Sequence, residues 1–211
     1  MTLAKPTHTS NHFVANVDWD GYCKIYKAMA PNRIRITYDQ GRLELMSPSP
    51  EHERIKSQLS CILEARFMAF EVDFLNGGST TFNSQLLDKG FEPDECYWLT
   101  HLEQVVDLST YDTQTSPPPD LGIEVDVSSS SMNRAGLYAA FGVTELWRYE
   151  QDETIRLLRL ENGVYHPVAG SLFLPRVEPT QVGEFVEMGK TLITSRLIRE
   201  VQKWAVHQRS E

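Results

Sequence analysis

The stretch that decides the fold runs from Pro117 to Ser131, Pro-Pro-Pro-Asp-Leu-Gly-Ile-Glu-Val-Asp-Val-Ser-Ser-Ser-Ser. Its three prolines end any preceding element, because proline lacks an N–H group and fixes φ. Apolar and polar residues then alternate, which predicts a strand over about residues 120–127 with one buried face. The buried face carries Leu121, Ile123, Val125 and Val127. The other face carries the carboxylates of Asp120, Glu124 and Asp126, with no lysine or arginine among them.

The acidic face of this strand has two interpretations. Same-face neighbours along a strand lie about 7 Å apart, so Glu124 and Asp126 repel each other unless a cation or a shared proton lies between them. A solvated edge strand would carry the same pattern of residues. The strand alone therefore leaves both a cation site and a solvated edge open.

A second acidic segment, residues 91–99, favours the cation site. It predicts a short strand in which Glu92 and Asp94 share one face, and Pro93 restricts that strand to an edge, a strand start or a bulge. If the two acidic strands are neighbours, they lie about 4.8 Å apart. Asp94 would then meet the acidic face of the first strand, and clustered carboxylates on rigid strands suit a hard divalent ion such as Mg²⁺.

Length and composition limit the class of protein. The chain has 211 residues, enough for one domain with a sizeable core. Its net charge of −9 excludes a global basic surface for nucleic acid, although whole-chain charge does not describe any one cleft. The three cysteines form no Cys-x-x-Cys pair, so the sequence indicates neither a zinc knuckle nor a redox pair. An odd number of scattered cysteines is typical of a protein in a reducing compartment. Residues 1–16 lack the apolar core of a signal peptide, and no apolar run is long enough for a membrane span, so we expect a cytoplasmic protein.

Hydrophobic periodicity and helix breakers predict the remaining elements. Helices are expected over residues 18–30, 50–70, 132–141 and 191–207, with the serines at 128–131 capping the third of them. Strands are expected over residues 34–38, 42–46, 71–75, 79–83, 143–149, 154–160 and 164–168. The first two are expected to form a hairpin across Asp39-Gln40-Gly41, and residues 79–83 are expected to pair back with residues 71–75. Residues 84–90, 100–119 and 169–189 are expected to be irregular. Strand, helix and strand over residues 120–149 predict a right-handed βαβ crossover with parallel strands, and Asn162-Gly163 predicts a hairpin.

Three motifs in a fixed order carry a resemblance to a known family. The first includes Ser47-Pro48-Ser49-Pro50-Glu51-His52, the second joins Glu92-Pro93-Asp94 to the strand after Pro119, and the third runs from Tyr138 to Trp147. Together they resemble the large bacterial, especially cyanobacterial, family of nuclease-like proteins with an Uma-type domain of unknown function, in the restriction-endonuclease-like PD-(D/E)XK superfamily. The resemblance covers roughly residues 33–170.

The resemblance implies a fold and a division of the chain. The expected fold is α/β (α+β), with a restriction-endonuclease-like mixed β-sheet core flanked by helices and extended by an antiparallel hairpin. Residues 1–32 would form an N-terminal tail and helix, residues 33–170 the core, and residues 171–211 a C-terminal extension ending in a helix. We expect these parts to make one globular domain overall.

The resemblance also assigns roles to individual residues. Asp94 would be the family's first metal-binding aspartate and Glu124 its acidic partner on the next core strand. Beyond the resemblance, we expect Asp126 to be a further ligand of Mg²⁺ or Mn²⁺. Two more residues are expected to be catalytic, His52 and Arg134. His52 would orient water or the acidic cluster, and either Arg134 or Lys56 would steady the phosphate. The accessory candidates are Glu44, Glu51, Lys56, Glu92 and Asp120.

The chain departs from the superfamily pattern at its lysine. The pattern places a lysine two residues after Glu124, where this chain has Asp126, and family members often carry a lysine four residues before Tyr138, where this chain has Arg134. Arginine stays protonated and stabilises phosphate charge, but it does not readily act as a base. Because a metal ion can activate water without a lysine base, the substitution does not exclude a nuclease.

The prediction that follows is a Mg-dependent endonuclease, a hydrolase that cleaves phosphodiester bonds in DNA. A catalytically inert relative that keeps the fold as a binding or assembly module is the first alternative, favoured by the missing lysine and the charge of −9. A carboxylate-pair sugar hydrolase is a second alternative, for which Trp98 and Trp147 would have to serve as sugar platforms. The six histidines show no paired spacing for a zinc enzyme. The resemblance implies a homodimer, and a monomer with a packed C-terminal helix is equally consistent with the sequence.

Overall fold

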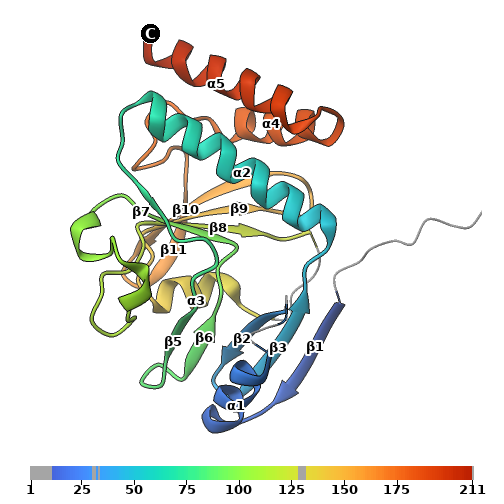
Figure 1. Cartoon of the computed structure of the whole chain (residues 1–211), viewed down its shortest axis with the longest axis vertical. Helices are drawn as coiled ribbons and strands as arrows, with labels where there is room; N and C mark the ends of the chain where they lie inside the picture. The colour runs from blue at the N-terminus through green and yellow to red at the C-terminus, as the bar shows by residue number, and fades with distance from the viewer. Residues whose placement is uncertain (1–10, 30–31, 33, 128–131, 211) are drawn as a thin grey trace, which may run out of the picture.

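A computed structural model describes residues 11–29, 32, 34–127 and 132–210. Within these ranges the chain forms two β-sheets, and five α-helices pack around them (Figure 1). A mixed sheet flanked by helices and extended by a hairpin was expected, and the structure contains one. A second, antiparallel sheet at the N-terminal end was not foreseen.

The N-terminal sheet has the strand order β1-β3-β2-β6-β5, and all its strand pairs are antiparallel. Its strands are β1 (Asn11–Asn16), β2 (Arg35–Asp39), β3 (Arg42–Ser47), β5 (Phe82–Ser84) and β6 (Lys89–Phe91). The predicted hairpin of β2 and β3 is confirmed, and its two turn residues, Gln40 and Gly41, both have positive φ, as a type I′ turn requires. Helix α1 (Trp19–Met29) packs on this sheet through Tyr22, whose ring stacks on Tyr38.

The second sheet has the strand order β11-β10-β9-β8-β7-β4. Its strands are β4 (Leu75–Asn76), β7 (Glu95–Trp98), β8 (Leu121–Val125), β9 (Glu145–Tyr149), β10 (Ile155–Glu161) and β11 (Val164–Val168). Strands β8 and β9 are parallel, as the predicted βαβ unit requires, and the other neighbours are antiparallel. The predicted Asn162-Gly163 hairpin joins β10 to β11.

Strand β8 lies between β7 and β9, so the solvated-edge interpretation is wrong. All five of its residues are buried. One face carries Leu121, Ile123 and Val125 into the larger core, which is completed by α2 (Pro50–Ala69), α4 (Pro179–Thr191) and α5 (Thr194–Ser210). The other face is covered by α3 (Arg134–Ala140). Both faces of the central strand are therefore closed to water.

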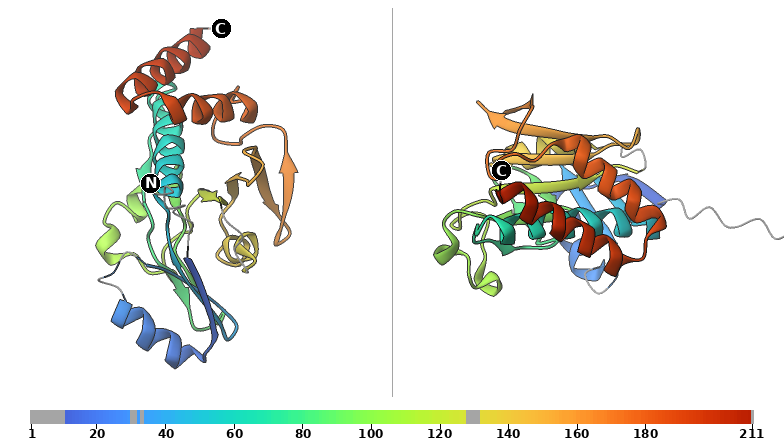
Figure 2. Two further views of the ribbon diagram at one scale, coloured as in Figure 1. Left: turned by 90° about the vertical axis from the view of Figure 1, so that its right-hand side faces the viewer. Right: turned by 90° about the horizontal axis from the view of Figure 1, so that it is seen from above.

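The helices lie at different positions along the length of the molecule. Helix α2 joins the two ends, and α4 and α5 lie at the end opposite α1 and the N-terminal sheet (Figures 1 and 2). Two short 3-10 helices, Leu102–Gln104 and Leu108–Thr110, interrupt the long connector between β7 and β8. None of the helices in the described part of the chain is long and apolar enough to cross a membrane.

Three expectations about individual elements were wrong. Residues 71–75 and 79–83 do not pair with each other: β4 pairs with β7, whereas β5 pairs with β6 in the other sheet. The turn between them packs Gly77 against the side chains of Trp98 and Cys96, where a Cβ atom would lie 2.4 Å from the tryptophan ring. Residues 169–189 contain helix α4, which starts at Pro179, and Lys89 and Gly90 belong to β6.

The start of α3 also differs from the expectation. The serines at 128–131, which were expected to cap this helix, lie outside the described residues. Asn133 is the N-cap, and its side chain accepts a hydrogen bond of 3.0 Å from the backbone N–H of Gly136. An asparagine cap satisfies one of the free N–H groups at a helix start just as a serine would.

Candidate active site

The two principal acidic residues meet where β7 and β8 begin to pair. Glu95 lies opposite Ile123 in the antiparallel register, which places Asp94 beside Glu124. The backbone N–H of Val125 donates a hydrogen bond of 2.6 Å to Asp94 Oδ2. Both side chains are buried, with 1% of Asp94 and 5% of Glu124 exposed. The predicted pairing of the two segments is therefore confirmed, but β7 begins only at Glu95, so Glu92 and Asp94 precede the strand on which they were expected.

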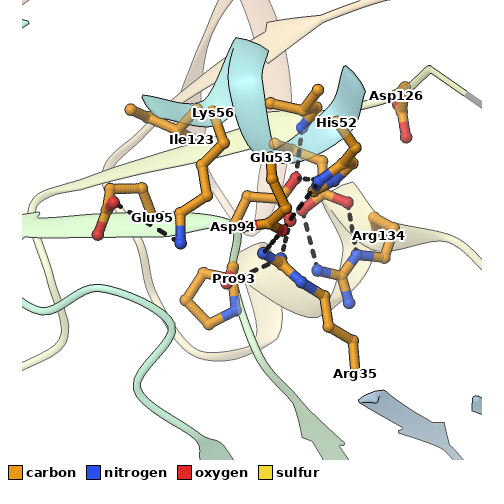
Figure 3. Close-up of polar contacts among 12 residues, drawn as sticks. Arg35, His52, Glu53, Lys56, Pro93, Asp94, Glu95, Ile123, Asp126 and Arg134 are labelled. Atoms are coloured by element: carbon orange, nitrogen blue, oxygen red, sulfur yellow. Dashed lines mark hydrogen bonds and ion pairs between the residues drawn. The ribbon is translucent and has the colours of Figure 1, made fainter. Parts of the chain in front are cut away.

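Asp94 is held by side chains from two further elements (Figure 3). His52 Nε2, in the first turn of α2, lies 3.1 Å from Asp94 Oδ2. The Arg35 guanidinium, on β2, forms an ion pair with Asp94 Oδ1 and also donates to the carbonyl oxygen of Pro93 at 3.3 Å. Arg35 reaches a second carboxylate, Glu53 Oε1, at 3.3 Å. One arginine thus ties β2, α2 and the start of β7 together around Asp94.

Local sequence explains why His52 lies at this point. Ser49 caps α2 by accepting a hydrogen bond of 3.1 Å from the His52 N–H, and Pro50 occupies the first helical position, where its missing N–H costs nothing. The cap fixes the start of the helix, so the imidazole projects toward β7. The motif at residues 47–52 therefore fixes the position of His52 at the start of α2.

His52 is neutral at pH 7. Burial lowers its pKa from 6.5 to about 4, and the nearby Arg35 cation acts in the same direction. The carboxylates of Glu124 and Glu53 favour the protonated form but are outweighed. Because the Asp94 carboxylate can only accept, the neutral ring donates its Nε2 proton to Asp94.

Glu124 is bound by a two-pronged arginine. Arg134 Nε donates to Glu124 Oε1 at 2.7 Å, and Arg134 Nη2 donates to Glu124 Oε2 at 3.0 Å. Tyr138 adds a hydroxyl hydrogen bond of 2.8 Å to Oε2. Burial raises the pKa of Glu124, but the Arg134 charge and these hydrogen bonds outweigh it, so the net pKa is lowered. Glu124 is therefore a carboxylate at neutral pH.

Helix α3 can approach Glu124 so closely because of Gly122. A Cβ atom at residue 122 would lie 2.6 Å from the Tyr138 ring. The absence of a side chain lets this ring lie against β8, with its hydroxyl at the strand backbone and at Glu124. The Asp-Leu-Gly-Ile-Glu sequence thus has a structural reason for its glycine.

Asp126 has a different partner from the other two carboxylates. It forms an ion pair with Arg148, which lies on β9 opposite Glu124 in the parallel register. Burial raises the pKa of Asp126, and the Glu124 charge adds to this effect. In Figure 3 Asp126 stands apart from the cluster around Asp94. The structure therefore brings Asp94 and Glu124 together and turns Asp126 toward Arg148.

Two accessory candidates lie next to this cluster. The Glu92 carboxyl accepts a hydrogen bond of 3.3 Å from Thr81, and burial raises its pKa. The backbone carbonyl of Glu92 accepts a hydrogen bond of 2.7 Å from Arg134 Nη2. Lys56 Nζ, one turn of α2 beyond His52, lies 3.9 Å from Glu95 Oε2. Both residues belong to the surroundings of Asp94.

The other three accessory candidates differ in position. Glu44 is buried on β3, opposite Thr37, and its Oε2 lies 3.6 Å from His12 Nδ1. Glu51 is exposed in the first turn of α2. Asp120 directly precedes β8, at the end of the strand away from Glu124. It accepts hydrogen bonds of 2.7 and 2.8 Å from the N–H groups of Leu99 and Thr100. Its carboxylate thus ties the end of β7 to the start of β8.

Several residues of the cluster were missed in the sequence. Arg35 and Thr37 alternate with Ile36 and Tyr38, so β2 has a polar face that could have been found by its period of two. Thr37 accepts a hydrogen bond of 2.8 Å from Arg134. Which carboxylate each arginine reaches depends on how the two sheets meet, and no local pattern encodes that contact.

A cleft of about 710 Å³ is lined by Arg35, the ion-pair partner of Asp94, whereas Asp94 and Glu124 are not among its lining residues. Its charged lining residues are Arg35, Glu53, Lys56 and Glu92. Its apolar lining residues include Tyr26, Ile34, Ile36, Pro48 and Pro50. The cleft thus leads from the surface to the arginine that holds Asp94.

The donor atoms of the pair suit a hard divalent ion, since two buried carboxylates on neighbouring strands offer the oxygen ligands that Mg²⁺ and Mn²⁺ prefer. Among the residues that the structure describes, no group of three or more histidine, cysteine, aspartate or glutamate side chains is placed to hold a metal ion. Each carboxylate of the pair also has a guanidinium partner. A cation at this site would therefore have to compete with Arg35 and Arg134.

Comparison with known proteins identifies a family. The model of the Uma2 family, described as a putative restriction endonuclease, matches residues 19–208. A crystal structure of a putative nuclease belonging to DUF820 from Anabaena variabilis ATCC 29413 is 14% identical in sequence, with a TM-score of 0.46 and a match that covers 81% of this chain and 90% of that chain. A search of the curated proteins finds no match.

Proposed function

The chain belongs to the Uma2 family of putative restriction endonucleases, and from this premise we propose that it is a metal-dependent nuclease that hydrolyses phosphodiester bonds in DNA. The family supports nuclease function in general. The observation that carries the finer proposal is the buried pair of Asp94, directly before β7, and Glu124 on the neighbouring strand β8. Burying two carboxylates side by side is costly and is typical of a functional site.

In this proposal Asp94 and Glu124 hold Mg²⁺ or Mn²⁺. The bound cation would neutralise charge on the phosphate and lower the pKa of a water molecule. Asp126 could become a third ligand of the cation only if its ion pair with Arg148 were broken, so we rank it after Asp94 and Glu124.

The remaining side chains of the cluster would position the pair. His52, neutral and hydrogen-bonded to Asp94, fixes the direction of that carboxylate and leaves one oxygen to Arg35. Arg134 keeps Glu124 ionised and bound to α3. Because its guanidinium is engaged by Glu124, Thr37 and the Glu92 carbonyl, we propose that Arg134 orients Glu124 and does not itself bind phosphate.

A second candidate function rests on one specific observation. Both carboxylates of the pair are already neutralised by arginine, so the site is electrostatically satisfied without a cation. This arrangement favours the inert binding or assembly module, in which the ion pairs would serve only to join the two sheets. The two candidates differ in whether the pair can exchange arginine for a metal ion.

Cleavage assays separate the two candidates. Wild type, Asp94→Asn and Glu124→Gln would be incubated with supercoiled plasmid and with single-stranded DNA in Mg²⁺ and in Mn²⁺. Glu161→Gln, an exposed carboxylate at the end of β10, is the matched control. We expect cleavage by wild type and the control and none by the two site variants, provided that circular dichroism shows all four proteins folded. Undiminished cleavage by both site variants would contradict the proposed site, and no cleavage by wild type would favour the inert module.

A further inference from the structure

We infer that Lys56 binds a backbone phosphate of a nucleic-acid strand lying in the cleft that Lys56 and Arg35 line. The inference rests on the proposed nuclease function and adds a substrate-binding residue to it. The cleft has two cationic lining residues in the described part of the chain, Arg35 and Lys56. The question is which of the cations near the carboxylate pair is available to a phosphate.

The two arginines nearest the pair are engaged. Arg35 donates to the carbonyl of Pro93 and to Glu53 and is ion-paired with Asp94. Arg134 uses its donors on Glu124, Thr37 and the Glu92 carbonyl, and only 8% of the residue is exposed. A phosphate would have to break several charge-assisted hydrogen bonds to reach either guanidinium, which makes both poor first contacts.

Lys56 differs from both arginines. Its ammonium lies 3.9 Å from the nearest carboxylate oxygen, Glu95 Oε2, which is beyond hydrogen-bond distance. Within the residues that the structure describes, no acceptor forms a hydrogen bond with Lys56 Nζ. Glu95 instead accepts a hydrogen bond of 3.1 Å from Ser60, one turn further along α2. The ammonium thus keeps its three N–H donors for an acceptor that enters the cleft.

The position of Lys56 also suits a contact with a phosphate. It projects from α2 toward the segment that carries Asp94 and Glu95, on the side of Glu95 (Figure 3). The same helix places His52 at Asp94, so Lys56 and one of the partners of Asp94 lie on one rigid element. A nucleic-acid strand with a phosphate on Lys56 would therefore pass Arg35, the residue that holds Asp94.

The rest of the cleft lining would restrict where a phosphate can lie. Glu53 and Glu92 repel a phosphate from their part of the cleft. Tyr26, Ile34 and Ile36 offer apolar contact for sugar or base. The lining therefore favours one phosphate contact at Lys56 over a general basic surface, in agreement with the net charge of −9.

The test measures binding separately from cleavage. Fluorescence anisotropy with a fluorescein-labelled single-stranded oligodeoxynucleotide, in EDTA and at several salt concentrations, would give the affinity and its salt slope for wild type, Lys56→Gln and Lys56→Arg. Lys203→Gln, an exposed lysine on α5, is the matched control. Losing one phosphate contact on a single strand reduces the slope of log affinity against log salt by about 0.7.

We expect Lys56→Gln to bind several-fold more weakly with the reduced slope, Lys56→Arg to restore the slope, and the control to match wild type. A Lys56→Gln slope equal to that of wild type would overturn the inference while leaving the proposed function intact. A wild type that binds no oligonucleotide and cleaves no DNA would overturn both together.

Discussion

Each carboxylate of the candidate site has its own cation, and this pairing explains how an acidic strand can be buried. Glu124 is matched by Arg134, Asp126 by Arg148 and Asp94 by Arg35. Transfer of a lone carboxylate from water to a protein interior is prohibitive, whereas a paired and hydrogen-bonded one is tolerated. The stability of the fold and the chemistry of the site therefore depend on the same few contacts.

Removal of Arg134 should be costly because it leaves Glu124 as an uncompensated buried charge. We expect Arg134→Met to lower the free energy of unfolding by about 3–5 kcal/mol. The double variant Arg134→Met with Glu124→Gln should lose much less than the sum of the two single variants, because neither partner is then left charged. Urea unfolding of the four proteins measures this cycle, and additive losses would contradict the ion pair.

His52 should make stability depend on pH. Its folded-state pKa of about 4 lies below the unfolded value of 6.5, so the unfolded chain binds more protons between these values. The free energy of unfolding should therefore fall by about 2 kcal/mol between pH 7 and pH 5 on account of this residue. His52→Asn, which stays neutral, should show a correspondingly flatter dependence in urea unfolding. Parallel curves for wild type and variant would refute the buried neutral histidine.

At the scale of elements, those with a strong hydrophobic periodicity could be predicted from the sequence, whereas the shortest elements could not. Strand β8, the two hairpins with their Gly-containing turns, and helix α2 with its Ser-Pro start were all recognisable, since each repeats a pattern over several residues. Strands β5 and β6 have three residues each, too few to establish a period of two. Helix α4 carries two glycines that weaken its apolar pattern, and it was mistaken for a loop.

The solvated-edge interpretation of β8 failed for a physical reason. An acidic face on a strand usually contacts water, and nothing within β8 itself neutralises it. The neutralising groups come from α3 and β9, which lie later in the chain. Sequence reasoning identified the carboxylates and Arg134, but it assigned this arginine to phosphate and did not identify Arg35 and Arg148.

Asp120 should be important for the junction of two strands but not for catalysis. Its carboxylate accepts hydrogen bonds from Leu99 and Thr100 and so holds the end of β7 to the start of β8. We expect Asp120→Ala to lower the free energy of unfolding by about 1–3 kcal/mol while the cleavage rate per folded molecule stays that of wild type. Thermal unfolding and a plasmid assay below the melting transition would test both parts, and a lost rate in a folded variant would assign Asp120 to the active site.

At the scale of the whole molecule, the candidate site lies where the two sheets meet. Strand β2 of the N-terminal sheet supplies Arg35 and Thr37, whereas Asp94 and Glu124 come from the second sheet, and α2 spans both (Figure 1). The order of strands in the N-terminal sheet joins segments from residues 11 to 91, so no local pattern predicts it. The contact between the sheets, and with it the arginine partners, had to come from the structure.

The central claim is that the Asp94 and Glu124 pair can bind a divalent cation in place of its arginine partners. Calorimetric titration of Mn²⁺ into wild type, Asp94→Asn, Glu124→Gln and the Glu161→Gln control tests this claim without any nucleic acid. We predict binding to wild type and to the control, and loss of that binding in both site variants. Equal affinity in all four proteins, or no binding to wild type, would contradict the claim.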